Sequence, residues 1–172
     1  LKADHTDNSG WLMAQVLTLR GDMINSGLLQ GNRQLSLEGS QLDNQQGGQL
    51  LTDGTLTGNV ATLNNHGAMQ ADEMVLNADR VQNVGNVRAG KALTAVVNGA
   101  LTNSGSLLSQ QQMDLQGTAI ENTGTLAANN LSLHSPTLSN AGLLQGNSSL
   151  TLDHQQLHNL HDGQLIAGGP LT

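Results

Sequence analysis

The sequence of 172 residues contains no cysteine, no phenylalanine and no tyrosine, and Trp11 is its one tryptophan. Without cysteine it has no disulfide and no thiolate metal site, which fits a secreted protein that needs no covalent crosslinks and fits many cytosolic proteins too. A globular core normally uses aromatic rings to fill irregular space. Their near absence predicts a narrow, regular interior in which side chains of one size repeat.

Charge is also scarce, because 11% of the residues are charged against about 25% in a typical domain. Thirteen Asp and Glu outnumber six Lys and Arg, which gives a formal net charge of −7, so nucleic acid is a poor partner. Disordered chains are usually rich in proline and poor in leucine. This chain has two prolines and 37% hydrophobic residues, so we expect a folded protein with an uncharged polar surface.

The sequence shows no signal peptide and no apolar segment of about 18 residues, and it begins at Leu1 instead of Met. We therefore expect a piece of a longer protein. The length is that of one ordinary domain, and residues 1–172 are expected to form a single segment of a longer filament.

The strongest feature is a repeat in which Asn is followed two residues later by Gly. Seven copies keep this spacing, and they begin at Asn8, Asn25, Asn65, Asn83, Asn103, Asn122 and Asn140. Two copies are stretched, from Asn44 to Gly47 and Gly48, and from Asn159 to Gly163. Asn8 and Asn159 are 151 residues apart over eight intervals, which is about 19 residues per unit.

Apolar residues keep a fixed position relative to this repeat. Two residues beyond each Gly stand Leu12, Leu29, Leu50, Met69, Val87, Leu107, Leu126, Leu144 and Leu165. Most units also carry two apolar residues around a polar one, as in Leu17 to Leu19, and an apolar residue two positions before the Asn, as in Leu101. A period of two is typical of a half-buried strand, so these positions predict a stack of interior side chains.

The repeated Asn allows two interpretations. It shares a strand face with the apolar residue two positions earlier, so the nine asparagines could stack inside and supply hydrogen bonds to one another. Alternatively, each lies in a turn, where Asn tolerates a positive φ. The Gly is expected at a corner that requires positive φ or close backbone approach. Each unit then consists of three short strands joined at corners.

These patterns predict an all-β fold, a right-handed parallel β-helix of about nine coils of ~19 residues each. One coil buries too few leucines to offset the ordering of its own backbone, so coils must stack, and neighbouring coils are the first partners. Three other repeat folds fit this sequence less well. Leucine-rich repeats place their Leu and Asn residues in a different order. Helical repeats need a 3.6-residue period, and β-propeller blades need about 40 residues with aromatic signatures.

Residues one period apart should lie above one another. Counted from the corner Gly, Asp53 and Asp72 coincide about 5 Å apart, a spacing that could suit Ca²⁺ or a retaining glycosidase, although two solvated loop acids explain them more simply. Glu73 and Lys91 also coincide and should form a surface ion pair. Arg80 and Arg88, with Lys91, could attract an acidic partner or form an ordinary solvated face.

The other candidates are weaker. His154, His158 and His161, followed by Asp162, keep no strand or helix period, and His158 should point outward. No nucleophile elbow of the Gly-x-Ser-x-Gly kind is present. Trp11 is expected at the surface or the end of the first coil. The sequence therefore assigns no catalytic, cofactor-binding or metal-ligating residue, and we expect a chain that is not an enzyme.

Units such as residues 101–108 and 113–117 resemble the haemagglutinin repeats of large two-partner-secretion exoproteins. These include filamentous haemagglutinin adhesins and the filaments that deliver contact-dependent growth-inhibition toxins. The resemblance covers essentially the whole chain. It implies export through an outer-membrane two-partner-secretion transporter and location at the bacterial cell surface.

Three functions follow from the resemblance and the fold. In the first, the chain is expected to be a structural stalk that holds an adhesive or toxic part away from the cell. Alternatively, loops near Asn44 or Asn159 bind a receptor on a host or bacterial cell directly. The third alternative is a β-helical polysaccharide-degrading enzyme.

Overall fold

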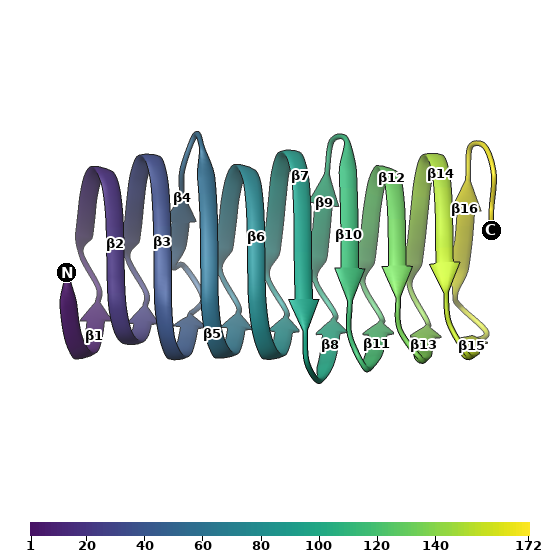
Figure 1. Ribbon diagram of the computed structural model, residues 1–172, viewed down its shortest axis with the longest axis horizontal. Coiled ribbons are helices and arrows are strands. Elements are labelled where there is room, and N and C mark those ends of the chain that lie inside the picture. The colour runs from purple at the N-terminus through teal and green to yellow at the C-terminus, as the bar shows by residue number, and fades with distance from the viewer.

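The computed structural model of the protein describes all 172 residues and contains strands, turns and no helix. The chain therefore has no helix that could cross a membrane. It winds into a single rod in which strands in front run downward and strands behind run upward while the chain advances from left to right, which makes the winding right-handed (Figure 1). The predicted right-handed parallel β-helix is confirmed.

Sixteen strands make up the rod: β1 (Lys2–Asn8), β2 (Trp11–Asn25), β3 (Leu28–Asn44), β4 (Gln49–Leu51), β5 (Thr55–Asn65), β6 (Ala68–Asn83), β7 (Asn86–Val97), β8 (Ala100–Asn103), β9 (Ser106–Ser109), β10 (Gln112–Gln116), β11 (Ala119–Asn122), β12 (Thr125–His134), β13 (Thr137–Asn140), β14 (Leu143–Asp153), β15 (Gln156–Asn159) and β16 (Gln164–Ala167). Every pairing between them is parallel.

Each coil contributes to three parallel sheets. Sheet I begins after each corner Gly and includes β4, β9 and β16. Sheet II contains the two apolar residues that flank a polar one, and includes β10. Sheet III ends at each Asn and includes β8, β11, β13 and β15. Several strands, such as β6, continue through more than one sheet because the backbone hydrogen bonding persists around the corner.

The interior consists of 34 buried hydrophobic residues in one continuous cluster. The nine apolar residues that follow the corner glycines are paired from one coil to the next without a break, and only Leu12 and Leu165, at the two ends, are partly exposed. Aliphatic side chains of similar size suffice, because each coil offers the same narrow space to its neighbours.

Gly58 occupies an interior position that is apolar in the other coils. Leu56, the first residue of the apolar pair in this coil, is fully buried, but Gly58 stands where the second apolar residue is expected. Leu76 of the next coil fills the space, because its Cδ2 lies 3.1 Å from where a Cβ on Gly58 would stand. A larger residue in one coil therefore compensates for a missing side chain in another.

The coils differ in length at their corners. Successive asparagines are separated by 17 to 21 residues, and the longest interval contains the stretched copy after Asn44, where Gly47 adopts a positive φ of 86°. The stretched copy after Asn159 also forms an exposed turn. Both copies enlarge surface turns and leave the interior columns in register, as the sequence predicted.

The corner glycines are required by close backbone approach. None of the glycines that follow an Asn by two residues has a positive φ. A Cβ on Gly85 would lie 2.1 Å from the carbonyl oxygen of Gly67, and a Cβ on Gly105 would lie 2.1 Å from that of Gly85. Any larger residue would push adjacent coils apart at that corner.

Leu107 and Leu108 provide a matched test of the interior, because they are neighbours in β9 and are 4% and 37% exposed. Leu107→Asp would bury an unpaired carboxylate and should lower the free energy of unfolding by more than about 4 kcal/mol. Leu108→Asp should change it by no more than about 1 kcal/mol. Thermal unfolding followed by circular dichroism gives both values, and equal values would contradict the interior placement of Leu107.

Candidate functional site

The nine repeated asparagines form a single column of side-chain hydrogen bonds along the rod. Each Nδ2 donates to the Oδ1 of the next Asn, at 2.7–2.9 Å, in all eight intervals from Asn8 to Asn159. The same Nδ2 also donates to the carbonyl oxygen of the corner Gly in its own coil, as Asn83 does to Gly85 at 3.1 Å. We call this column the asparagine ladder.

The ladder lies at the edge of the interior and is closed to solvent over most of its length. Asn8 and the seven asparagines that follow it are buried, whereas Asn159 in the last coil is exposed. Every buried side-chain nitrogen and oxygen atom has a hydrogen-bond partner. No residue other than Gly has a positive φ, so the conformational preference of Asn for such turns plays no part.

All eight ladder bonds point in the same direction, from the amino-terminal coil to the carboxy-terminal coil. Aligned amide dipoles strengthen one another in a low-dielectric environment. The eight buried amides of this column are neutral, hydrogen-bonded and inaccessible to a substrate, so their role is structural.

Charged side chains gather at the corner between sheets I and II. Lys91 Nζ donates to Asp72 Oδ2 at 2.5 Å, and this hydrogen bond, with the negative charge of Asp72, raises the pKa of Lys91 above 10.5. The predicted pairing of Lys91 with Glu73 is therefore wrong. Glu73 pairs in register with Ala92, because this corner has one more residue in the coil of Lys91 than in the coil of Asp72.

The predicted stacking of Asp53 on Asp72 fails for the same reason. Between two paired positions, residues 52–54 in one coil face residues 71–72 in the next, and the backbone N–H of Asp72 donates to the carbonyl of Gly54 at 3.0 Å. Both carboxylates line a surface hollow of about 470 Å³ with Arg88. One of them is already neutralised by Lys91.

The three basic residues near one another in sequence do not form one patch. Arg88 lies in sheet I, where it pairs with Gln70, and Arg80 lies in sheet III, where it pairs with Thr62. Lys91 is at the corner and is engaged by Asp72. The prediction of one surface that attracts an acidic partner through all three residues is therefore wrong.

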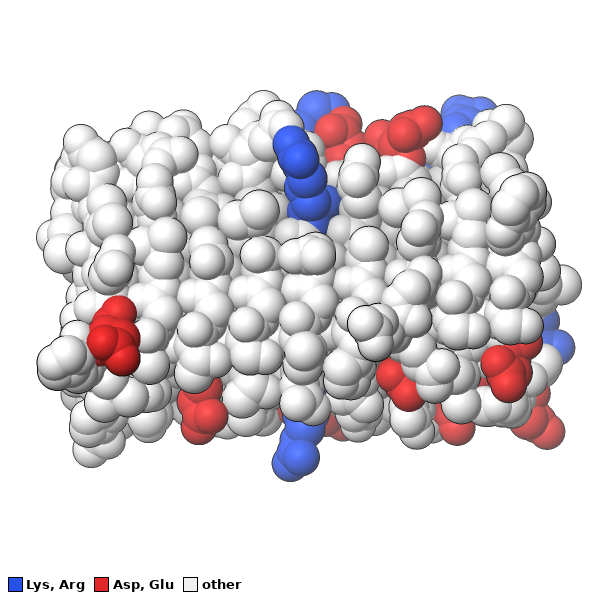
Figure 2. Space-filling view, turned by 180° about the vertical axis from the view of Figure 1, so that it is seen from behind, with Lys and Arg blue, Asp and Glu red and all other residues white.

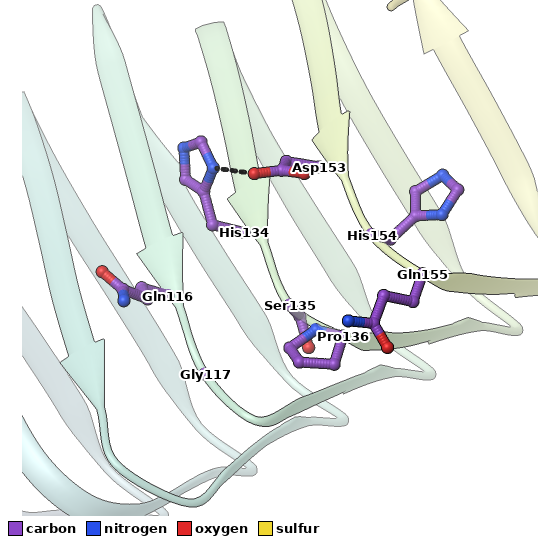
Figure 3. A pocket seen from close by; sticks show the side chains of 8 residues that line it. All are labelled: Gln116, Gly117, His134, Ser135, Pro136, Asp153, His154 and Gln155. Atoms are coloured by element: carbon purple, nitrogen blue, oxygen red, sulfur yellow. Dashed lines mark hydrogen bonds and ion pairs between the residues drawn. The ribbon is translucent and has the colours of Figure 1, made fainter.

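A histidine that is absent from the sequence predictions lies between carboxylates of the coils before and after its own. His134 Nε2 lies 3.5 Å from Asp114 Oδ1, and its Nδ1 lies 3.5 Å from Asp153 Oδ2. Figure 3 shows His134 and Asp153 above a hollow of about 280 Å³ that also has Ser135 and His154 on its wall. No motif marks these residues; only the alignment of Gln116, His134 and Asp153 in one column could have found them.

The late histidines remain apart. His158 is exposed, as predicted, and His161 Nδ1 lies 3.0 Å from Asp162 Oδ1. No group of three or more His, Cys, Asp and Glu side chains is arranged to hold a metal ion. Trp11 is 80% exposed in the first full coil, which confirms its predicted surface location.

Asn122 and Glu121 offer a paired test of the ladder. Asn122 Nδ2 donates to Asn140, Gly124 and Leu143, so Asn122→Ala should leave buried partners unsatisfied and cost roughly 2–4 kcal/mol of unfolding free energy. Glu121→Ala, on the exposed side of the same strand, should cost less than about 0.5 kcal/mol. Denaturant unfolding measures both changes, and an Asn122→Ala variant as stable as Glu121→Ala would contradict a stabilising ladder.

The Asp72 and Lys91 pair gives a prediction for titration. Asp72→Asn should lower the pKa of Lys91 toward 10.5, because the hydrogen bond and charge that raise it are lost. Since the folded pKa lies above the unfolded one, the pair stabilises the fold below about pH 10.5, and this stabilisation disappears as the pH rises through the folded pKa. NMR titration of the Lys91 ε-methylene should show the shift in Asp72→Asn and not in the control Asp53→Asn; an unchanged Lys91 titration would refute it.

The amino-acid sequence of the chain matches a known protein family. The haemagglutinin repeat family matches residues 1–78, 70–134 and 126–172, which together cover the whole chain. No solved structure matches the chain.

Three similar proteins come from different bacteria. A tRNA nuclease CdiA from Escherichia coli O6:K15:H31 is 36% identical and matches 100% of this chain and 6% of its own length. A deoxyribonuclease CdiA from Dickeya dadantii is 34% identical over 86% of this chain and 5% of its own.

A 16S rRNA endonuclease CdiA from Enterobacter cloacae subsp. cloacae is 30% identical over 94% of this chain and 5% of its own length. The chain thus spans about a twentieth of these relatives. Because the family match extends from Leu1 to Thr172, and each of its three matched segments spans several coils of the rod, this chain belongs to the haemagglutinin repeat family.

Proposed function

We propose that residues 1–172 are a structural segment of a filament on a secreted bacterial exoprotein, where they hold an adhesive or toxic part away from the cell. The observation that carries the proposal is the continuity of the asparagine ladder and the buried columns from one end of the chain to the other. The repeated residues are used to stack coils. In this proposal the ladder and column residues have structural roles.

The relatives support a segment that is independent of catalysis. Their names specify nucleases with three kinds of target, namely tRNA, 16S rRNA and DNA, yet all three match this chain. A segment that selected the nucleic acid would be expected to differ among them. We therefore propose that this chain is not itself an enzyme, and that the larger part of such an exoprotein supplies any activity.

The topology also supports export before folding. Each strand of the rod pairs with strands of the coil before or after its own, so a chain that emerges from a transporter can fold one coil at a time as its next residues arrive. The absence of cysteine removes any need for oxidation. We accordingly propose an outer-membrane two-partner-secretion transporter as the partner in export, and the bacterial cell surface as the destination.

Direct adhesion remains the second candidate. Its support is the pair of enlarged turns, at residues 45–48 and 160–163, in which residues 45–47 and 160–162 are exposed. Leu160 is exposed in the second turn, so an apolar group is available to a receptor. The third hypothesis, a polysaccharide-degrading enzyme, has no such support, because its proposed carboxylates Asp53 and Asp72 are out of register.

Deletion of one coil tests the stalk. Removal of residues 104–122 takes out one ladder interval of 19 residues and joins Asn103 to the next Thr and Gly. In the full exoprotein, this variant should remain folded, should retain adhesion or toxin delivery, and should be shorter by about 4.8 Å. The out-of-register deletion of residues 104–113 should unfold and abolish both.

Exchange of the two enlarged turns for short corners separates the two candidates. A stalk should retain adhesion or delivery after the exchange, as measured with whole cells. Loss of adhesion by the exchanged variant, with an unchanged circular dichroism spectrum and full activity of the in-register deletion, would instead establish the direct adhesive role.

A further inference from the structure

The outward side of sheet I is nearly free of charge. Each of its nine strands presents two side chains to solvent, one on either side of the buried column residue. Arg88 is the single Asp, Glu, Lys or Arg among them. Figure 2 looks onto this side of the rod and shows charged side chains mainly along its edges. We call this surface the neutral face.

Half of the outward residues on the neutral face are apolar. Trp11 is 80% exposed, Met13 56% and Ile166 44%, and Leu28, Leu51 and Leu108 also contribute. Most of the others are Gln, Asn, Ser and Thr. Depletion of charge combined with exposed apolar groups and uncharged hydrogen-bonding groups is the composition of a protein interface.

The other two sheets have a different surface. Sheet II presents Glu38 beside its ion-pair partner Arg20, and also the carboxylates of Glu73 and Asp153. Sheet III presents the carboxylates of Asp43 and Glu121 and one basic residue, Arg80. Since the whole chain has a formal charge of −7, two copies that met through sheet II or III would bring carboxylates together. The neutral face is the side on which two copies meet without this repulsion.

The neutral face is also regular enough to pack against the same face of a second copy. Its nine strands are paired in register with no bulge between them, because the irregular positions all lie at or beyond the corners. At about 4.8 Å per strand and about 10 Å of width, it covers roughly 430 Å² in each copy. That is below the ~800 Å² per partner of a standard interface, so the pair is weak for this length and strengthens in proportion to the number of coils.

We propose that the neutral face is a lateral docking surface for a second copy of this chain, so that two rods lie side by side with their sheets I packed against each other. Packed sheets are about 10 Å apart. Apolar and amide side chains of the two copies then interdigitate, and the carboxylates of both remain on the outside. Arg88, which has no ion-pair partner within its own chain, limits the affinity, because the pairing brings two such groups near one another.

Single cysteines test the proposal cleanly, because the chain has none of its own. Asn86 and Thr94 lie in the same strand, β7, in the middle coil; Asn86 faces outward on sheet I and Thr94 on sheet II. Under mild oxidation at equal concentration, Asn86→Cys should form disulfide-linked dimers at least about tenfold faster than Thr94→Cys. Equal rates would overturn the proposal.

Two added charges give the complementary measurement. Gln70→Lys with Leu108→Lys, which flank Arg88 in the neighbouring coils, should reduce the Asn86→Cys rate to that of the Thr94→Cys control. Both positions are outward, so circular dichroism should remain that of the parent. An undiminished rate would contradict docking through the neutral face.

Small-angle scattering distinguishes lateral pairing from other association. At increasing protein concentration, lateral pairs should enlarge the cross-section of the rod with little change in its length. Growth in length at constant cross-section, together with equal crosslinking rates, would indicate contact through the ends of the rods alone and would overturn the proposal. The absence of any concentration dependence together with equal crosslinking rates would also overturn it.

Discussion

The parallel hydrogen bonds between one coil and the next determine the rest of this structure. They fix which residue lies above which, so a position that is buried in one coil is buried in its neighbours. The corner glycines permit that pairing to continue around the coil, since a Cβ at Gly85 or Gly105 would collide with the backbone of the coil below. The asparagine ladder adds a side-chain repeat of the same register. A sequence that must satisfy one register at every coil has little freedom for irregular chemistry.

The sequence predicted the parts of the fold that obey a strict alternation. The columns containing Leu107 and Leu101 and the parallel β-helix follow from residues that keep a period of two within a strand and about 19 between coils. The two enlarged turns follow from the stretched copies at Asn44 and Asn159, which depart from that spacing. The corners were harder. Their lengths differ by a residue or two, and counting from the corner Gly therefore assigned Lys91 to Glu73, although Asp72 is its partner.

Other features depend on pairs of coils, which a single repeat does not reveal. The glycine at interior position 58 is explained only by Leu76 of the next coil, which fills the space that a side chain at Gly58 would occupy. His134 lies between Asp114 and Asp153 because of alignment across three coils, and each of these residues is unremarkable within its own coil. The charge-poor side of sheet I likewise emerges only when outward residues of all nine strands are viewed together. These features could not be predicted from one repeat, because each depends on residues in two or more neighbouring coils.

The direction of the asparagine ladder makes the rod a polar object. At every level the amide nitrogen faces one end of the rod and the amide oxygen faces the other. A fibre extended by further coils thus has an acceptor-type terminus and a donor-type terminus, which differ as the two ends of an α-helix do. Two such fibres can join head to tail, whereas a head-to-head junction would set oxygen against oxygen, and growth accordingly has a built-in sense.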